Sequence, residues 1–265
     1  MMVKVVVCGA LGRMGRKIIE LGIQDKDVEI VGGIEHPDCI SSLDLGEALG
    51  KLELKGKPLT SRLEEVLPMA DVVIEFSGNP TAAVSYTKLT SLEKKAIVIG
   101  TTGFTPQEIE EIKEYSKEAP VLLSPNMSLG VNLLFKLVEI AARVLKDKNF
   151  DVEIMEIHHR FKKDAPSGTA MKLVEILSKV LDRKNIVFGR EGEAPRKESE
   201  IGVMSLRGGD VVGDHTIFFL GFGERLELSH RASSRDTFAK GAVEAAKWIK
   251  GKEPGFYTMF DVLGL

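Results

Sequence analysis

The sequence predicts an α/β protein in which a doubly wound parallel sheet is joined to a second α+β domain with an open mixed or antiparallel sheet. Two patterns in the 265 residues predict this fold. In the first half, short apolar runs alternate with amphipathic stretches, which is typical of parallel strands connected by helices on both faces. In the second half, several runs alternate apolar and polar residues, which indicates strands with one uncovered side.

The composition excludes several classes of function. Hydrophobic residues make up 43% and charged residues 28%, which is typical of a globular protein. The formal net charge is only -3, so non-specific binding to nucleic acid is not favoured. No apolar run approaches the ~20 residues of a membrane span, and the first residues lead directly into a strand. We therefore expect a cytoplasmic protein. Cys8 and Cys39 have neither the spacing of a disulfide framework nor that of a metal site.

The first predicted strand, Val3 to Cys8, is an apolar run that ends in a glycine-rich turn. Glycines at such a turn let the backbone approach a pyrophosphate, and the N-terminus of the following helix meets its charge. The spacing Gly-x-x-Gly-x-x-Gly lacks one glycine of the strict dinucleotide fingerprint, so plain chain reversal is the alternative. The candidate cofactor contacts in this turn are Gly9, Ala10, Leu11, Gly12, Arg13 and Met14.

The second predicted strand, Val28 to Ile34, ends in Glu35, about 20 residues after the glycine-rich turn. A carboxylate at this position accepts hydrogen bonds from the adenosine ribose of NAD and repels a 2'-phosphate. His36 follows and is at most partly charged at neutral pH. We expect NADH to be used well, and NADPH use is the open alternative.

Further apolar runs, Asp71 to Phe76, Ala96 to Ile99 and Val121 to Leu123, extend the strand and helix alternation. The pattern predicts a Rossmann-like sheet. Ligands of such sheets lie at the carboxyl ends of the strands, where Ser77, Gly100 and Ser124 fall.

The most informative stretch, Glu156 to Ala170, contains two adjacent histidines. His158 and His159 can exchange protons near neutral pH, and Arg160 and Lys162 add permanent positive charge. Neighbouring residues of a strand point to opposite faces, so we expect one histidine to transfer a proton and the other to hold substrate. Zinc is disfavoured because no cysteine or third histidine lies nearby at ligand spacing.

The same stretch then turns and opens an amphipathic helix. Ser167 or Thr169 is the expected N-cap, and Gly168 lets a ligand approach the first amides closely. A helix N-terminus of this kind suits a carboxylate or phosphate. A basic run alone is more often a solvated surface, but the turn beside it favours a binding site.

The remaining sequence predicts a helix from Ser128, strands at Ile201 to Arg207, His215 to Leu220 and Leu226 to His230, and a final helix at Asp236 to Lys250. Between them, Gly189 to Glu200 is charged and contains glycine and proline. We expect it to be an exposed, mobile loop that could act as a lid.

The motif His-His-x-x-Lys-x-Asp-Ala-Pro-Ser-Gly-Thr-Ala, at His158 to Ala170, closely resembles the signature of the 4-hydroxy-tetrahydrodipicolinate reductase (dihydrodipicolinate reductase) family. The resemblance implies NADH- or NADPH-dependent reduction of a cyclic dicarboxylate in the diaminopimelate route of lysine biosynthesis, with no metal. It implies that His158 is the proton donor, Lys162 a second donor and His159 a substrate ligand. Gly168 and Thr169 would hold a substrate carboxylate.

Two further segments are similar to the family. Gly100-Thr101-Thr102-Gly103-Phe104 resembles its nicotinamide-side loop, and a segment that begins Ser124-Pro125-Asn126-Met127 resembles the part that closes on the nicotinamide. Met127 stands where the family commonly has Phe, and we expect it to pack on the ring.

The resemblance also implies the domain organisation. The final segment would return to the nucleotide domain, so that residues 1–126 and 235–265 form one domain and residues 127–234 the other. The second domain would build a homotetramer. We interpret His215 and His230 as structural or interfacial.

Two alternatives remain. Another two-domain nicotinamide oxidoreductase would share the first domain but would not need a helix N-terminus beside paired histidines. A dinucleotide-sensing regulator would not need His158 and Lys162 together, and it usually has a DNA-reading element, which the sequence does not show.

Overall fold

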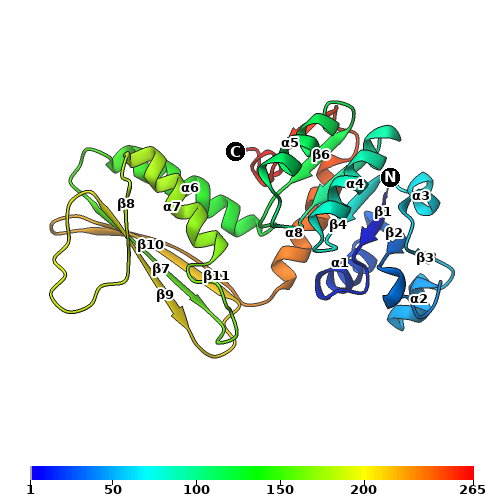
Figure 1. Cartoon of the computed structure of the whole chain (residues 1–265), viewed down its shortest axis with the longest axis horizontal. Helices are drawn as coiled ribbons and strands as arrows, with labels where there is room; N and C mark the ends of the chain where they lie inside the picture. Colours follow the sequence, from blue (N-terminus) through cyan, green and yellow to red (C-terminus); the bar gives the residue numbers. More distant parts are fainter. Residues whose placement is uncertain (1) are drawn as a thin grey trace. The chain divides into compact units, whose positions relative to one another are not determined.

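The computed structural model describes residues 2–265, which form two compact units (Figure 1). The first unit contains the residues up to Leu129 and the segment Asp236–Leu265, and the second unit contains Gly130–Arg235. The chain therefore leaves the first unit once and returns to it.

The first unit contains a seven-stranded sheet in which every pair of neighbouring strands is parallel. The strand order is β12-β6-β5-β4-β1-β2-β3. The strands are β1 (Val3–Cys8), β2 (Val28–Ile34), β3 (Leu59–Thr60), β4 (Val72–Glu75), β5 (Ala96–Ile99), β6 (Pro120–Leu123) and β12 (Gly255–Tyr257). The predicted parallel sheet is confirmed, and the C-terminal segment adds its edge strand beside β6.

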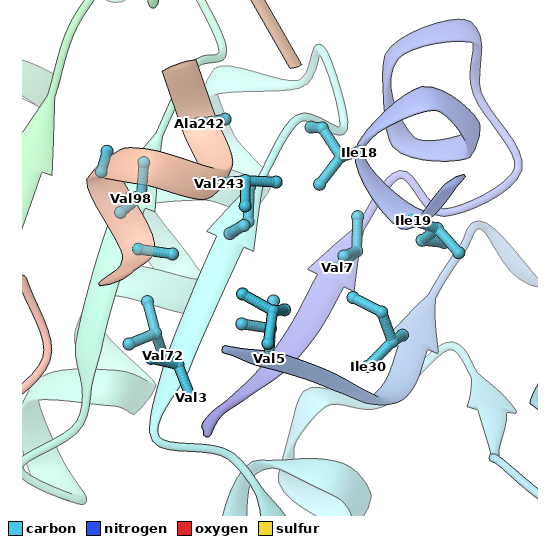
Figure 2. Packing of buried hydrophobic residues seen from close by; sticks show 14 of the residues in the cluster. Val3, Val5, Val7, Ile18, Ile19, Ile30, Val72, Val98, Ala242 and Val243 are labelled. Atoms are coloured by element: carbon cyan, nitrogen blue, oxygen red, sulfur yellow. The ribbon is translucent and has the colours of Figure 1, made fainter. Parts of the chain in front are cut away.

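Helices cover both faces of this sheet. Successive residues of a strand point to opposite faces, and here both sets are apolar, so each face must be covered. Val5 and Val7 of β1 pack with helices α1 and α8 on one face, whereas Val6 and Cys8 belong to a separate core cluster on the other face. Figure 2 shows Ile18, Ala242 and other side chains that complete the first of these clusters. Each valine buried in this way stabilises the fold by roughly 1.5–3 kcal/mol.

The helices of the first unit are α1 (Arg13–Gln24), α2 (Leu45–Leu49), α3 (Leu63–Val66), α4 (Pro80–Leu92), α5 (Pro106–Tyr115), α8 (Asp236–Ile249) and α9 (Met259–Leu263). Short 3-10 turns lie at Pro37–Cys39, Leu52–Leu54 and Leu67–Met69.

The second unit contains a mixed five-stranded sheet in the order β11-β10-β7-β9-β8. The strands are β7 (Asp151–His158), β8 (Asn185–Phe188), β9 (Glu200–Arg207), β10 (Gly213–Leu220) and β11 (Arg225–Ala232). Strands β7, β8 and β9 are mutually parallel, and β10 is antiparallel to both of its neighbours. Helices α6 (Leu129–Leu145) and α7 (Gly168–Leu181) lie along one face (Figure 1). The α+β second domain with a mixed sheet is confirmed.

Strand β7 shows why this sheet has a covered and an uncovered face. Along it, Val152, Ile154, Glu156 and His158 are buried, and the residues between them are only half-buried. Successive side chains of a strand point to opposite faces, so the buried set faces the helices. Two of its four members are polar, and these form the centre of the site.

The segment between β8 and β9 is exposed as predicted, but two arginines fasten it to the sheet. Arg190 pairs with Glu200 at 2.8 Å, and Arg196 pairs with Asp151 at 2.6 Å and with Glu153 at 3.0 Å. These ion pairs anchor both ends of the loop. The role of the loop as a lid stays a prediction.

Candidate active site

The glycine-rich turn after β1 is built so that a side chain could not be added at two of its positions. Gly9 has φ of +74°, and a Cβ there would lie 2.6 Å from the carbonyl oxygen of Phe76. A Cβ on Gly15 would overlap the backbone of Gly9 and lie 2.9 Å from Cα of Ala10. The turn is thus packed backbone against backbone, which is the condition for a close approach to a pyrophosphate.

The start of α1 fits an anion. Its N-cap residue, Gly12, supplies no side-chain cap, and no acidic residue lies in the first turn. The first amides of a helix have no intrahelical partner and meet the positive end of the helix dipole. Of the predicted contacts, Gly12 and Arg13 are exposed, whereas Ala10 is fully buried beneath the turn.

Glu35 holds the turn to the end of β2. Its carboxylate accepts the amide of Leu11 at 2.8 Å and the amide of His36 at 2.9 Å. A carboxylate can accept about four hydrogen bonds, so lone pairs remain for the two hydroxyls of a ribose. His36 is exposed, and its Nδ1 accepts the amide of Asp38 at 3.4 Å. These residues fit the adenosine ribose of a nicotinamide dinucleotide.

The loops after β4 and β5 are joined to each other. Thr101 Oγ1 accepts the amide of Gly78 at 3.0 Å, and Glu75 accepts the amide of Ser77 at 2.8 Å. Gly100 is required because the ring of Phe76 occupies the space that its Cβ would fill. Thr102 is exposed. Glu75 is fully buried, and burial raises the pKa of its carboxyl.

The segment after β6 is fixed by its own side chains. Ser124 Oγ donates to the carbonyl of Asn126 at 2.8 Å, and Asn126 Oδ1 accepts the amide of Ser128 at 2.9 Å. Pro125 is exposed, but Met127 is only 2% exposed and belongs to the core cluster of the first unit. The sulfur-containing side chain therefore serves packing in this structure, and its predicted contact with the nicotinamide stays a prediction.

The centre of the second unit's site is Glu156, whose side chain is fully buried. Arg207 donates to both of its carboxylate oxygens, at 2.9 and 2.7 Å. His158 Nδ1 lies 2.5 Å from Oε2, and the amide of Ser167 donates to Oε1 at 3.2 Å. Two strands and the start of α7 therefore converge on one carboxylate.

The two adjacent histidines have different surroundings, but only His158 lies in the strand, whereas the prediction placed both there. His158 is the last residue of β7 and is buried at 8% exposure, whereas His159 lies just beyond the strand and is half-buried. His159 Nδ1 is buried without a hydrogen-bonding partner in the described part of the chain, and its ring centroid is 6.4 Å from that of Phe161.

Lys162 is held close to the histidines by the turn that follows them. Its amide donates to the carbonyl of His159 at 3.1 Å, and its ammonium pairs with Asp164 at 2.9 Å. The lysine side chain is 21% exposed, whereas that of Asp164 is 60% exposed. A solvated partner of this kind can exchange for a substrate carboxylate at low cost.

The N-terminus of α7 has the predicted cap. Ser167 Oγ accepts the amide of Ala170 at 3.2 Å, which makes Ser167 the N-cap residue, and the exposed Gly168 begins the helix with Thr169 after it. The same Ser167 hydroxyl lies 3.0 Å from Nε2 of His215. His215 is buried at 4% exposure, and its role as a structural or interfacial residue stays a prediction.

Burial and charge set the pKa values of this cluster. Burial alone would raise the pKa of Glu156, but the hydrogen bonds from Arg207, Ser205 and His158 outweigh it and lower the pKa to about 2. Burial lowers the pKa of His158, against the opposing effect of Glu156. Burial and the neighbouring His158 lower the pKa of His215 to about 4. The carboxylate of Glu156 therefore stays ionised at neutral pH beside Arg207.

Sequence reasoning did not assign Glu156 or Arg207 to the site. Glu156 lies two residues before His158, on the same face of the strand, and this spacing was a usable signal. Arg207 is far away in the sequence, and only the parallel pairing of β7 with β9 places it opposite His158.

Among residues 2–265, no group of three histidine, cysteine or acidic side chains is arranged to hold a metal ion. The helices of the same residues include none that is long and apolar enough to cross a membrane.

The fold and these two sites define a two-domain nicotinamide-dependent oxidoreductase. A family model described as "Dihydrodipicolinate reductase, N-terminus" matches residues 3–127, and one described as "Dihydrodipicolinate reductase, C-terminus" matches residues 130–263. The chain belongs to the dihydrodipicolinate reductase (4-hydroxy-tetrahydrodipicolinate reductase) family, whose members use NADH or NADPH. The resemblance of the sequence to this family is confirmed.

Individual relatives cover the whole chain. A 4-hydroxy-tetrahydrodipicolinate reductase of Aquifex aeolicus is 85% identical over 265 residues, which are 100% of both chains, and that of Geotalea daltonii is 46% identical over 100% of both. The solved structure of dipicolinate-bound dihydrodipicolinate reductase from Paenisporosarcina sp. TG-14 has a TM-score of 0.81 and 24% identity, and the match covers 98% of this chain and 99% of the other. This likeness supports the fold.

Proposed function

We propose that the chain catalyses the reduction of 4-hydroxy-tetrahydrodipicolinate to tetrahydrodipicolinate, a step of the diaminopimelate route to lysine. The observation that carries the proposal is the cluster at the end of β7. There, His158 and Lys162 lie beside the N-terminus of α7, whose cap is Ser167. Family membership supplies the substrate, and the cluster has the groups that a cyclic dicarboxylate requires.

The substrate carries two carboxylates, and the second unit has three groups suited to them. The amides of Gly168 and Thr169 open a 14-residue helix, where backbone N–H groups and the helix dipole favour an anion. Lys162 supplies a positive charge whose present partner, Asp164, is solvated. His159 has a buried ring nitrogen without a partner among the described residues. We assign these four residues to substrate binding, with Lys162 also serving as a second proton donor.

His158 is the proposed proton donor. The reduced nicotinamide, NADH or NADPH, supplies a hydride when it is bound at the first unit's glycine-rich turn. The reaction also takes up one proton and releases the substrate's hydroxyl as water. His158 meets the need for a proton because its partner Glu156 stabilises the imidazolium while burial favours the neutral ring. A donor balanced in this way transfers its proton readily near neutral pH.

The cofactor contacts proposed in the first unit are the turn residues Gly9 to Met14, then Glu35 and His36, then Gly100 to Thr102 and Ser124 to Met127. The Cβ-excluding packing at Gly9 and the uncapped N-terminus of α1 support a pyrophosphate there. Glu35, which already accepts two backbone amides, supports a ribose.

A direct assay tests the proposed function. The protein is incubated with NADH and freshly generated 4-hydroxy-tetrahydrodipicolinate, and the absorbance of the reduced nicotinamide is followed. We expect the absorbance to fall only when both are present, and we expect His158→Gln to reduce kcat by roughly 100-fold or more. The exposed Lys163 of the same turn gives the control, Lys163→Met, for which turnover should stay close to that of the wild type. Wild-type turnover in His158→Gln would remove His158 from this role, and no oxidation at all would contradict the function.

We also propose that the enzyme is a homotetramer built through the uncovered face of the second sheet. This face presents a line of apolar side chains, since Met155 of β7 pairs with Met204 of β9 and Ile157 pairs with Leu206. Leu206 is 44% exposed, and an apolar sheet face of this kind is typical of an association surface. Light scattering should give four times the chain mass for the wild type and less for Met204→Lys. A monomeric wild type would contradict the proposal.

We infer that the enzyme works in the cytoplasm. Cys8 and Cys39 are both free, as is usual where thiols stay reduced. Cell fractionation with an antibody to the chain tests this inference, and recovery in an exported fraction would contradict it.

A further inference from the structure

We propose that Glu156, clamped by Arg207, is a positioning residue that fixes the tautomer of His158, with the proton on Nδ1 and with Nε2 as the nitrogen that exchanges a proton with substrate. The proposal rests on the proposed role of His158 as proton donor. It adds to that role an orienting carboxylate and names the reacting nitrogen.

The hydrogen-bond pattern of Glu156 determines which atom carries the proton. Its two oxygens accept both guanidinium nitrogens of Arg207, at 2.7 and 2.9 Å, and the amide of Ser167 at 3.2 Å. A carboxylate paired with arginine in this fork geometry is unprotonated and can only accept. The short contact of 2.5 Å between Oε2 and His158 Nδ1 therefore requires a hydrogen on Nδ1.

The opposite edge of the His158 ring lies against a residue without a side chain. A Cβ added to Gly213 would lie 2.9 Å from Nε2 and 3.3 Å from Cδ2 of the imidazole. Glycine at this position of β10 leaves the Nε2 edge uncrowded. When the imidazolium loses a proton from Nε2, the Nδ1–H tautomer remains. This tautomer still donates its Nδ1–H to the carboxylate of Glu156. The same carboxylate thus stabilises the ring before and after proton transfer.

Glu156 also joins the proton donor to the anion site. The amide of Ser167 donates to the carboxylate, and Arg207 Nη2 donates to the carbonyl of Asp164 at 2.7 Å. Glu156 and Arg207, the pair that orients His158, therefore also fix the turn that carries Lys162 and the start of α7. A change in the pair would disturb the geometry of the reacting nitrogen more than the general affinity for the dicarboxylate.

The histidine is surrounded by charged or titratable groups from every neighbouring element. Glu156 precedes it on β7, Arg207 faces it from β9, and Lys162 follows it in the turn. His215 of β10 packs edge-on, with ring centroids 5.2 Å apart. Among residues 2–265, Glu156 is the one anion that contacts a ring nitrogen of His158, so the proposed effect is specific to this carboxylate.

The decisive test is nitrogen NMR of the wild-type protein labelled with 15N-histidine. The resonances of His158 are identified by their loss in His158→Gln. We expect neutral His158 to be the Nδ1–H tautomer, and a neutral ring protonated on Nε2 would overturn the proposal. This measurement needs no substrate and no folded Glu156 variant, so its outcome is independent of whether the proposed function holds.

A kinetic test compares two glutamates of the same strand. Glu153 lies on the other face of β7, where it pairs with Arg196 at 3.0 Å and Arg190 at 3.4 Å. We expect Glu156→Gln to lower kcat by roughly 10- to 100-fold, the scale for loss of an orienting partner, with KM for the dicarboxylate changed by less than about threefold. Glu153→Gln should alter neither value. A rise in KM with unchanged kcat in Glu156→Gln would overturn the proposal and leave the proposed function standing.

Discussion

The two units build their sites from different materials. In the first unit, the proposed cofactor site consists mainly of backbone: glycines at Gly9 and Gly15 that exclude any Cβ, and amides at the uncapped start of α1. In the second unit, the site is a cluster of charged side chains around Glu156, brought together from β7, β9 and the start of α7. One site is defined by where side chains are absent, and the other by which side chains meet.

This difference decides how each site fails. A backbone site is damaged by added atoms, which cost packing energy in the turn itself. A charge cluster is damaged by removed atoms, because each lost partner leaves a buried polar group unsatisfied and a reacting group misplaced. Substitutions in the first unit should therefore act mainly on stability and cofactor binding, and those in the second unit on turnover.

The largest expected effect is on turnover, in Lys162→Met. The ammonium of Lys162 is half-buried beside the histidines, and methionine keeps the length of the side chain while removing its charge and its protons. We expect kcat to fall by roughly 100- to 10,000-fold, the range for general acid catalysis, as measured by oxidation of NADH. The matched control is Lys163→Met, since this neighbouring lysine is exposed. Equal losses in the two variants would show that the turn needs only positive charge.

The next effect concerns the pH dependence of stability. The pKa of His215 is lowered from 6.5 to about 4 by burial, so between these values the unfolded chain binds more protons than the folded one. The free energy of unfolding should then fall by about 3 kcal/mol as the pH falls from about 6.5 to about 4. The lowered pKa of His158 acts in the same direction.

Denaturant titrations at a series of pH values measure this dependence. His215→Gln keeps a polar group near Ser167 but cannot titrate, so the curve of stability against pH should become flatter over this interval. His36→Gln, a substitution at an exposed histidine, should keep the wild-type curve. An unchanged slope in His215→Gln would show that other groups cause the acid sensitivity.

A smaller effect is expected in the backbone site. Gly15→Ala places a Cβ against the backbone of the preceding turn, which cannot move aside, and we expect a loss of about 1–3 kcal/mol in the free energy of unfolding. Gly22 lies in the same helix, and there the added Cβ would meet the end of the flexible Ile30 side chain at 2.7 Å. Gly22→Ala should cost less, because alanine favours helix and Ile30 can shift. A Gly15→Ala protein as stable as the wild type would contradict the close packing of the turn.

The features that the sequence predicted correctly are those that depend on residues close together in the chain. The run Val3 to Cys8 coincides with β1, and Ser167, one of the two predicted cap residues, is the N-cap of α7, because each feature depends on neighbours in sequence. The two-residue strand β3 and the strand β8 were not found, since neither has a pattern that differs from a loop. Predictions succeeded where structure is local.

The site divides in the same way. The spacing of the glycines in the first unit indicated a possible backbone site, with plain chain reversal as the alternative. Arg207 is one arginine among many, and His215 is one histidine in an ordinary strand. Their contacts with Glu156 and Ser167 depend on the pairing of β7 with β9 and β10. No pattern within a short window of sequence contains that pairing.

The smallest expected effect is on cofactor preference, in His36→Arg. This variant changes a side chain in the proposed site that is otherwise made of backbone. Glu35 accepts two amides and is the proposed ligand of the cofactor's ribose, while the exposed side chain of His36 beside it contacts Asp38. The carboxylate should repel a 2'-phosphate, and an arginine in place of His36 should offset that repulsion with a bidentate, permanently charged partner. We expect His36→Arg to raise kcat/KM with NADPH by roughly tenfold, about 1.4 kcal/mol, and to leave kcat/KM with NADH within about threefold of the wild type. His36→Gln, which adds no charge, is the matched control. If the wild type already favours NADPH over NADH by more than tenfold, Glu35 does not select the cofactor, and the selection lies elsewhere in the turn, with the exposed Arg13 as the first residue to test.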